Sequence, residues 1–331
     1  MNGPTDPVFR LLNDYQRGFP LLPRPFLAIG QKVGLTEEAV LDSYRRFLAE
    51  GVVSRIGAVL PPRRVGVSTL AALAVPVSDL ERVAALVTAR AQVNHNYQRE
   101  HDFNLWFVLA ARNEEALAEQ LREITRESAC PLISLPLRES FHIDLGFDLA
   151  GGCKHVQPNA AALTERACAL PELERSLLAA LEPGLAVESR PFKVLGDRVG
   201  LSEDFTLELL GRWLAEGLIK RLGVVVRHHE LGYTANAMCV WDVPDEDVSA
   251  VGRALAGETG ITLCYRRQRA QPHWPYNLFC MIHGKAREEV LALRADLARR
   301  HGLDVHPHAV LFSTRRFKQQ GARYLAGACH A

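Results

Sequence analysis

The sequence predicts an α+β protein in which one module, a winged helix-turn-helix followed by a βαββαβ sandwich, occurs twice in tandem. Two observations predict this fold class. The segment AEGVVSRIGAVL at residues 49–60 returns as AEGLIKRLGVVV at residues 215–226, an offset of 166 residues. Around each copy, apolar residues first recur at helical spacing and then alternate in short strand-like runs. A repeat of this kind indicates duplicated structural units.

The repeat extends well beyond the matching segments. The same offset relates PF at residue 25 to PF at residue 191, and GL at residue 34 to GL at residue 200. Further on the offset drifts, because NLWFVLAA begins at residue 104 and its counterpart NLFCMIHG at residue 277. We infer that loops have changed length while the helices and strands have stayed.

Each copy opens with the pattern of three helices. We expect first helices over residues 8–17 and 173–181, and then short helices ending at glycine in PFLAIGQKVG and PFKVLGDRVG. Thr36 and Ser202 are good N-caps for a third helix, because acidic residues follow each in the first turn. The apolar RIGAVL and RLGVVV segments then predict the wings.

A ferredoxin-like βαββαβ pattern follows each wing, and in the first copy its last strand is predicted at residues 132–137. Such a sheet leaves one face open, so we expect the two sandwiches to bury these faces against each other as an internal pseudo-dimer. We expect a winged helix at 1–66, a ferredoxin-like domain at 67–150, a linker at 151–171, a winged helix at 172–232 and a ferredoxin-like domain at 233–331.

Composition limits the classes of function. The 331 residues are 48% hydrophobic and 23% charged, with a net charge of +1, whereas nucleic-acid binders usually carry a basic excess. Apolar runs are too short for a membrane helix, and the first residues do not have the pattern of a secretory leader, so we expect a cytoplasmic protein with no membrane partner. The seven cysteines include no CxxC pair, and we predict no metal site.

Acidic residues occupy the start of both predicted recognition helices, where a DNA-binding protein would approach phosphates. Carboxylates at these positions repel the DNA backbone, so we expect no DNA binding despite the helix-turn-helix. The acids are Glu37, Glu38 and Asp42 in the first copy and Glu203, Asp204 and Glu208 in the second.

Several motifs carry a resemblance to known families. The wings with the following Gly66 and Gly232 resemble the Lrp/AsnC regulators. NHNYQREHDFNLWFVLAA and FHIDLGFDL in the first half resemble the D-type subunit of the siroheme decarboxylases, and HWPYNLFCMIHG and STRRFK in the second half resemble the L-type subunit. The chain is therefore similar, over nearly its whole length, to a fused NirDL-type siroheme decarboxylase.

This resemblance implies a carboxy-lyase of heme d1 biosynthesis. Such an enzyme removes the acetate carboxyls at C12 and C18 of siroheme to give 12,18-didecarboxysiroheme. It implies no cofactor beyond the iron-containing tetrapyrrole substrate, because the macrocycle itself can hold the electrons that the leaving carbon dioxide releases.

The candidate site residues combine proton donors with cationic anchors. Siroheme carries many carboxylates, which arginine binds bidentately, and histidine can donate a proton at neutral pH. Strand alternation is expected to place His95, Tyr97 and Arg99 on one face, and Tyr265, Arg267 and Arg269 likewise, with Arg266 and His273 in the following loop. The predicted catalytic residues are His95, His101, His142 and Tyr97. The predicted substrate-binding residues are Arg99, Arg138, Tyr265, Arg266, Arg267, His273, Tyr276, Arg315 and Arg316.

Two other functions stay open from the sequence. One is a transcription regulator of the Lrp/AsnC type, and the other is a tetrapyrrole carrier or sensor that binds without turnover. The sequence also leaves open which acetate leaves first, whether both halves are active, whether a histidine ligates the substrate iron, and whether the fused chain forms a homodimer.

Overall fold

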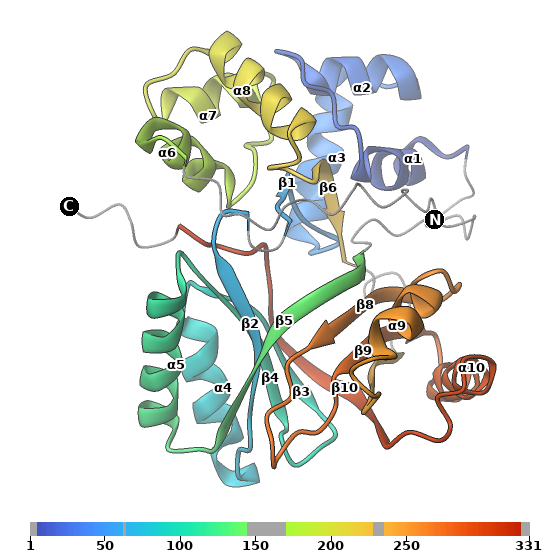
Figure 1. Cartoon of the computed structure of the whole chain (residues 1–331). Coiled ribbons are helices and arrows are strands. Elements are labelled where there is room, and N and C mark those ends of the chain that lie inside the picture. The colour runs from blue at the N-terminus through green and yellow to red at the C-terminus, as the bar shows by residue number, and fades with distance from the viewer. Residues whose placement is uncertain (1–4, 62–63, 144–169, 228–234, 326–331) are drawn as a thin grey trace. The chain divides into compact units, whose positions relative to one another are not determined.

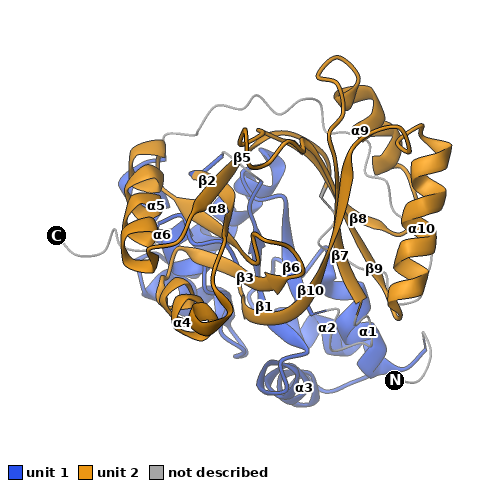
Figure 2. Cartoon of the chain, turned by 90° about the horizontal axis from the view of Figure 1, so that it is seen from below, with its two compact units in different colours: residues 1–66, 146–231, 321–331 blue, residues 67–145, 232–320 orange. Residues whose placement is uncertain are grey.

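The computed structural model describes residues 5–61, 64–143, 170–227 and 235–325. The chain divides into two compact units (Figure 2). The helical unit gathers residues 1–66, 146–231 and 321–331, and the barrel unit gathers residues 67–145 and 232–320. Most of the predicted linker, residues 151–169, lies outside the described residues. Among the residues described, no helix is both long and apolar enough to cross a membrane.

The helical unit contains both winged helices, and its elements follow the predicted duplication (Figure 1). Thr36 accepts a hydrogen bond from the Ala39 N–H at 3.2 Å, and Ser202 accepts one from the Phe205 N–H at 3.2 Å, so both third helices begin at the predicted caps. The first copy comprises α1 (Pro7–Asn13), the 3-10 helix η1 (Asp14–Gln16), α2 (Pro25–Val33), α3 (Glu37–Ala49) and β1 (Val53–Val59). The second comprises α6 (Glu172–Leu181), α7 (Pro191–Asp197), α8 (Glu203–Ala215) and β6 (Arg221–Val226).

The two wings pair with each other. β1 and β6 form a two-stranded antiparallel sheet in which Gly57 lies opposite Gly223, its own counterpart in the repeat. A Cβ atom added to Gly223 would lie 2.3 Å from the backbone oxygen of Gln16. Glycine is therefore required where the strand meets the end of η1, and the duplicated wings hold the two copies together.

The barrel unit is one closed eight-stranded barrel with the strand order β10-β3-β4-β2-β5-β8-β9-β7 (Figure 1). It closes because β5 of the first half pairs with β8 of the second, and β10 of the second half pairs with β3 of the first. The first half comprises β2 (Val67–Leu73), η2 (Val77–Asp79), α4 (Leu80–Ala89), β3 (Val93–Arg99), β4 (Leu105–Ala111), α5 (Glu114–Ser128) and β5 (Leu132–Ile143). The second comprises β7 (Ala235–Trp241), α9 (Val248–Ala256), β8 (Ile261–Arg267), β9 (Leu278–Gly284), α10 (Arg287–Arg300) and β10 (His308–Gln319).

The predicted fold class, a tandem α+β duplication whose sandwiches pack as a pseudo-dimer, is confirmed. Two elements differ from the prediction. The helix expected over residues 8–17 is divided into α1 and η1, and β5 continues six residues beyond its predicted end at residue 137. The added residues supply the pairing with β8, from Leu137 opposite Arg267 to Ile143 opposite Leu263. The last strand of each half is thus long because it serves two sheets.

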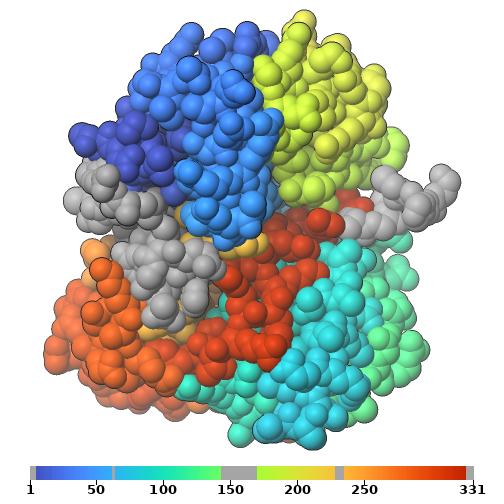
Figure 3. Space-filling view, turned by 180° about the vertical axis from the view of Figure 1, so that it is seen from behind, coloured from blue at the N-terminus to red at the C-terminus, as the bar shows by residue number. Residues whose placement is uncertain are grey.

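Three apolar clusters form the core of the barrel unit. One lies between the first half's strands and α4 and α5, a second between the second half's strands and α9 and α10, and the third fills the barrel interior. Figure 3 shows the red surface of β10 beside the cyan surface of the first half. The Lys318 ammonium of β10 donates a hydrogen bond to the Thr88 carbonyl of α4 at 2.8 Å. The interior cluster includes Ala72, Phe103, Trp106, Leu135, Met238, Trp274, Phe279 and Leu311.

Two arginines, the buried Arg99 and the half-buried Arg267, repeat the cross-pairing of the two halves. Arg99 donates to the Leu311 carbonyl at 3.0 Å, and Arg267 donates to the Leu135 carbonyl at 2.9 Å. Each arginine thus binds the last strand of the other half. Burial lowers the pKa of Arg99 to about 10, which still leaves the guanidinium charged at neutral pH.

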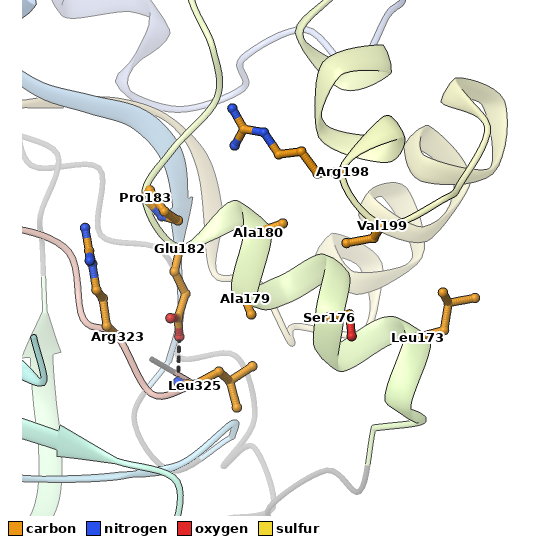
Figure 4. A pocket seen from close by; sticks show the side chains of 10 residues that line it. All are labelled: Leu173, Ser176, Ala179, Ala180, Glu182, Pro183, Arg198, Val199, Arg323 and Leu325. Carbon is orange, nitrogen blue, oxygen red and sulfur yellow. Dashed lines mark hydrogen bonds between the residues drawn. The ribbon is translucent and has the colours of Figure 1, made fainter. Parts of the chain in front are cut away.

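In the helical unit, a buried carboxyl group holds the segment that follows β10. Glu182 accepts hydrogen bonds from the backbone N–H groups of Tyr324 at 2.7 Å and Leu325 at 3.2 Å. Burial raises its pKa to about 7, although those hydrogen bonds and then the charges of Arg323 and Arg55 act in the opposite direction. A pocket of about 530 Å³ lies beside this contact (Figure 4). It is lined by Leu173, Ser176, Ala179, Ala180, Glu182, Pro183, Arg198, Val199, Arg323 and Leu325, none of which is a predicted site residue.

The close contact at the wing gives the first testable prediction. Gly223→Ala is expected to destabilise the protein by about 1–3 kcal/mol, because the methyl group collides with the Gln16 backbone. Gly211→Ala is the matched control, since an added Cβ there meets nothing within 4 Å and alanine favours the helix. Urea unfolding of both variants measures the difference. Equal stabilities would show that the wing has room for a side chain.

The raised pKa of Glu182 predicts a pH dependence. Because its folded value of about 7 lies above the ordinary 4.5, its contribution to stability is fully present below pH 4.5 and is lost as the pH rises through 7. Glu182→Gln should remove this loss, which is at most about 3 kcal/mol. Unfolding free energies at pH 5 and pH 8 measure it, with the exposed Glu188→Gln as control. A wild-type stability that stays constant over this range would contradict the prediction.

Candidate functional site

The first candidate row lies on β3, where alternate side chains share a face. The rings of His95 and Tyr97 stack with centroids 6.3 Å apart, and the Arg99 guanidinium lies 5.6 Å from the Tyr97 ring centre. Asn96, between them, points the other way and donates to the Ala84 carbonyl of α4 at 3.3 Å. The structure therefore brings His95, Tyr97 and Arg99 together, in the order that alternation predicts.

The second half repeats two members of this row. The Arg267 guanidinium lies 4.8 Å from the Tyr265 ring centre and 5.9 Å from that of Phe279. The expected third member, Arg269, does not continue the row, because β8 ends at Arg267 and the chain turns away. Arg266, expected in the loop, lies on β8 instead and binds Asp245 at 2.8 Å.

His101 lies in the turn between β3 and β4. Its Nδ1 atom accepts a hydrogen bond from the Phe103 N–H at 3.0 Å, so the neutral ring carries its proton on Nε2. Burial lowers its pKa, although the charge of Asp102 acts in the opposite direction. His101 is therefore a neutral hydrogen-bond donor at pH 7.

The loop between β8 and β9 brings the second half against His101. It spans residues 268–277, whereas the equivalent turn of the first half spans only residues 100–104. Trp274 from this loop is fully buried and lies edge-on to His101, with ring centroids 5.2 Å apart. It also packs against Trp106 at 4.9 Å and Tyr276 at 5.0 Å, while His273 is exposed.

The three histidines predicted as proton donors lie at three different positions in the barrel unit. About 13 Å of extended strand separates His95 from Arg99, and His101 lies beyond Arg99 in the turn. His142 lies on β5, opposite Cys264 of β8. Each histidine therefore has a different environment, and His101 contacts the loop of the second half through the ring of Trp274.

The remaining predicted arginines lie on exposed surface. Arg138 donates to the side chain of Gln268, and Arg316 donates to that of Gln319 at 3.3 Å. Arg315 forms an ion pair with Glu81 in the first turn of α4. Their roles in binding stay predictions.

Sequence reasoning missed the arrangement of the longer loop. Strand alternation places Arg269 in a row with Tyr265 and Arg267, but both Arg269 and Trp274 lie in this loop. The drift of the repeat offset was the available signal, because the extra residues lie between Arg267 and Leu278. Their folding onto His101 depends on contacts between the halves, which the local pattern does not contain.

Comparison with known proteins completes this description. The model of the AsnC-like ligand binding domain matches residues 64–142 and 230–318, and that of the siroheme decarboxylase NirDL-like HTH domain matches residues 9–53 and 174–220. Together the two models account for both copies of each predicted module.

Full-length relatives match as well. The siroheme decarboxylase NirDL subunit of Paracoccus denitrificans is 44% identical over 317 residues, covering 95% of both chains. The crystal structure of the siroheme decarboxylase NirDL matches with a TM-score of 0.70 and 30% identity, covering 97% of this chain and 95% of that one. A second structure, of NirDL in complex with an iron-uroporphyrin III analogue, matches with a TM-score of 0.69 and 30% identity over 97% and 94% of the two chains. The suspected resemblance is thereby confirmed, and the chain belongs to the siroheme decarboxylases, a family of decarboxylating enzymes.

Proposed function

We propose that this protein decarboxylates siroheme at the C12 and C18 acetates, giving 12,18-didecarboxysiroheme for heme d1 biosynthesis. The observation that carries the proposal is the 44% identity to a siroheme decarboxylase over 95% of both chains. The iron-uroporphyrin analogue bound to a related NirDL supports an iron tetrapyrrole as the ligand.

The reaction itself requires one proton for each acetate. The bond between the methylene carbon and the carboxylate breaks, carbon dioxide leaves, and the electron pair stays on the methylene carbon. The conjugated macrocycle stabilises that charge until a proton converts the methylene group to methyl. No oxidant or reductant is consumed, so the protein has to bind the carboxylates and deliver a proton.

His95 is proposed as the proton donor. Its Nδ1 atom lies 3.0 Å from Asn94 Oδ1, which can accept the Nδ1 proton, so the protonated ring would give up its Nε2 proton to the substrate carbon and return to the neutral form. Stacking on Tyr97 restricts the ring, and the buried charge of Arg99 follows on the same face. Tyr97 is proposed to orient the substrate, and Arg99 to favour a carboxylate nearby.

His101 is proposed to hold a substrate carboxylate rather than to act as a cationic acid. Its Nδ1 atom is already used by the Phe103 N–H, so Nε2–H is the available donor. The second half is proposed to contribute Tyr265, Arg267, His273 and Tyr276 to binding. Arg138, Arg266, Arg315 and Arg316 stay candidates that would exchange a protein partner for a substrate carboxylate, and His142 stays a candidate acid.

The absence of a DNA-binding role is also a proposal, and contacts in the helical unit support it. Glu37 at the start of α3 binds Arg24, and Glu203 at the start of α8 binds Arg190. Ser189 donates to Glu37 at 2.9 Å, so a residue of the second copy covers this end of α3. The two wings, β1 and β6, pair with each other.

Anaerobic incubation with siroheme, followed by mass spectrometry of the tetrapyrrole, tests the activity. We expect successive losses of one and two carbon dioxide units. Tightly bound but unchanged siroheme would instead identify a carrier or sensor. A failure to bind siroheme, together with a shift of DNA in gels at low salt, would favour a regulator.

Single histidine variants test the assigned roles. His95→Ala is expected to lower kcat by about 10²–10⁴-fold, because a general acid contributes on that scale. His101→Ala should mainly raise KM for siroheme, since it removes a hydrogen bond to a carboxylate. His308→Ala, an exposed position at the start of β10, is the control. Full activity of the His95 variant would overturn its assignment.

A further inference from the structure

Arg269 is the centre of a hydrogen-bond network at the base of the β8–β9 loop. Its guanidinium donates to Asp242 Oδ1 at 2.6 and 2.9 Å and to Asp245 Oδ1 at 2.8 Å. It also donates to the backbone carbonyls of Val243 at 2.7 Å and Pro275 at 2.8 Å. One side chain therefore joins both ends of the loop to the segment that follows β7.

Asp245 ties further residues into the same network. It accepts hydrogen bonds from Arg266 at 2.8 Å and from the Asn277 amide at 3.2 Å, in addition to that from Arg269. Its hydrogen bond with Arg269 is the main cause that holds the pKa of Asp245 below its ordinary value. The carboxylate is thus charged throughout the neutral range, and the base of the loop is cross-linked on both sides.

The loop turns tightly between this base and the barrel interior. The Ala270 N–H donates to the Trp274 carbonyl at 2.9 Å, and the Trp274 N–H donates to the Ala270 carbonyl at 2.8 Å. This bridge directs the Trp274 indole inward, where it lies 5.2 Å from His101 and is fully buried. Arg269 thus lies directly before the turn that carries Trp274.

We infer that Arg269 is a positioning residue that fixes the loop of the second half so that Trp274 packs against His101 of the first half. The inference rests on the proposed function in placing His101 at the substrate. One binding site is then built by both halves, with the imidazole from one and its supporting wall from the other.

The chemistry of the side chain supports this role. Arginine presents five donors in a rigid plane and can bind two carboxylates and two carbonyls at once, whereas lysine has a single ammonium. Burial is the main cause that lowers the pKa of His101, and Trp274 supplies part of that burial, with Asp102 as the charged neighbour that acts oppositely. A loosened loop would admit water and bring the pKa of His101 back towards its ordinary value.

The Arg269→Lys variant tests the inference through two readouts. We expect an NMR titration to show the pKa of His101 raised by about half a unit or more, because water reaches the ring. With siroheme as substrate, kcat/KM should fall about 10-fold or more, because a displaced loop misplaces the binding groups. If this variant fails to fold, Asp245→Asn, which keeps the shape but removes the charge, should produce a smaller shift in the same direction.

The matched control is Arg253→Lys. Arg253 lies on α9 and forms an ion pair with Glu139 of β5 at 3.2 Å, and neither residue belongs to the loop. It should leave the titration of His101 unchanged. An unchanged His101 pKa in both Arg269→Lys and Asp245→Asn would overturn the inference. A raised pKa with full decarboxylation would uphold the positioning of His101 and reject its proposed role in binding, so the two failures are distinguishable.

Discussion

The barrel depends on the pairing of each half's last strand with the other half. β5 and β10 leave their own sheets midway and continue beside β8 and β3, so that neither sheet keeps a free edge. Arg99 and Arg267 reinforce the same crossing from inside, each bound to a carbonyl of the opposite half. A buried guanidinium without such a partner would be costly, so these hydrogen bonds and the strand crossing stabilise each other.

This crossing brings residues of both halves into the barrel interior, and there the duplicate halves have diverged. The aromatic position of β4, Trp106, donates its indole N–H to the Phe103 carbonyl, while the equivalent position of β9 is Phe279. In the second half the longer loop supplies a tryptophan instead. The ring of Trp274 lies 4.9 Å from that of Trp106 and 6.3 Å from that of Phe279. The two halves of the barrel interior thus differ mainly because their β3–β4 and β8–β9 connections differ in length, while their strands keep the same arrangement.

The fold was predictable because its signals are local or repeated. Two copies of one segment, N-caps at Thr36 and Ser202 and strand alternation specify the modules without any long-range information. The row of His95, Tyr97 and Arg99 was predictable for the same reason. The continuation of β5 and the inward turn of Trp274 were not, since both depend on partners in the other half. The prediction that Arg269 continues the strand row was wrong, because β8 ends at Arg267. Beyond the strand, five hydrogen bonds hold the Arg269 side chain at the base of the loop.

The register of the wings indicates how such a chain can evolve. Gly57 opposite Gly223 marks a local axis that relates each residue of one wing to its counterpart in the other. In a dimer of identical chains, a substitution near that axis is present in both chains, so any loss of stability that it causes occurs twice. In a fused chain, each position can change independently of its counterpart. Gln16 and Glu182 occupy equivalent positions, yet Glu182 binds the segment after β10 through its side chain, whereas the Gln16 carbonyl accepts a hydrogen bond from Arg221. Fusion thus lets one half take on a task while the other keeps the ancestral packing.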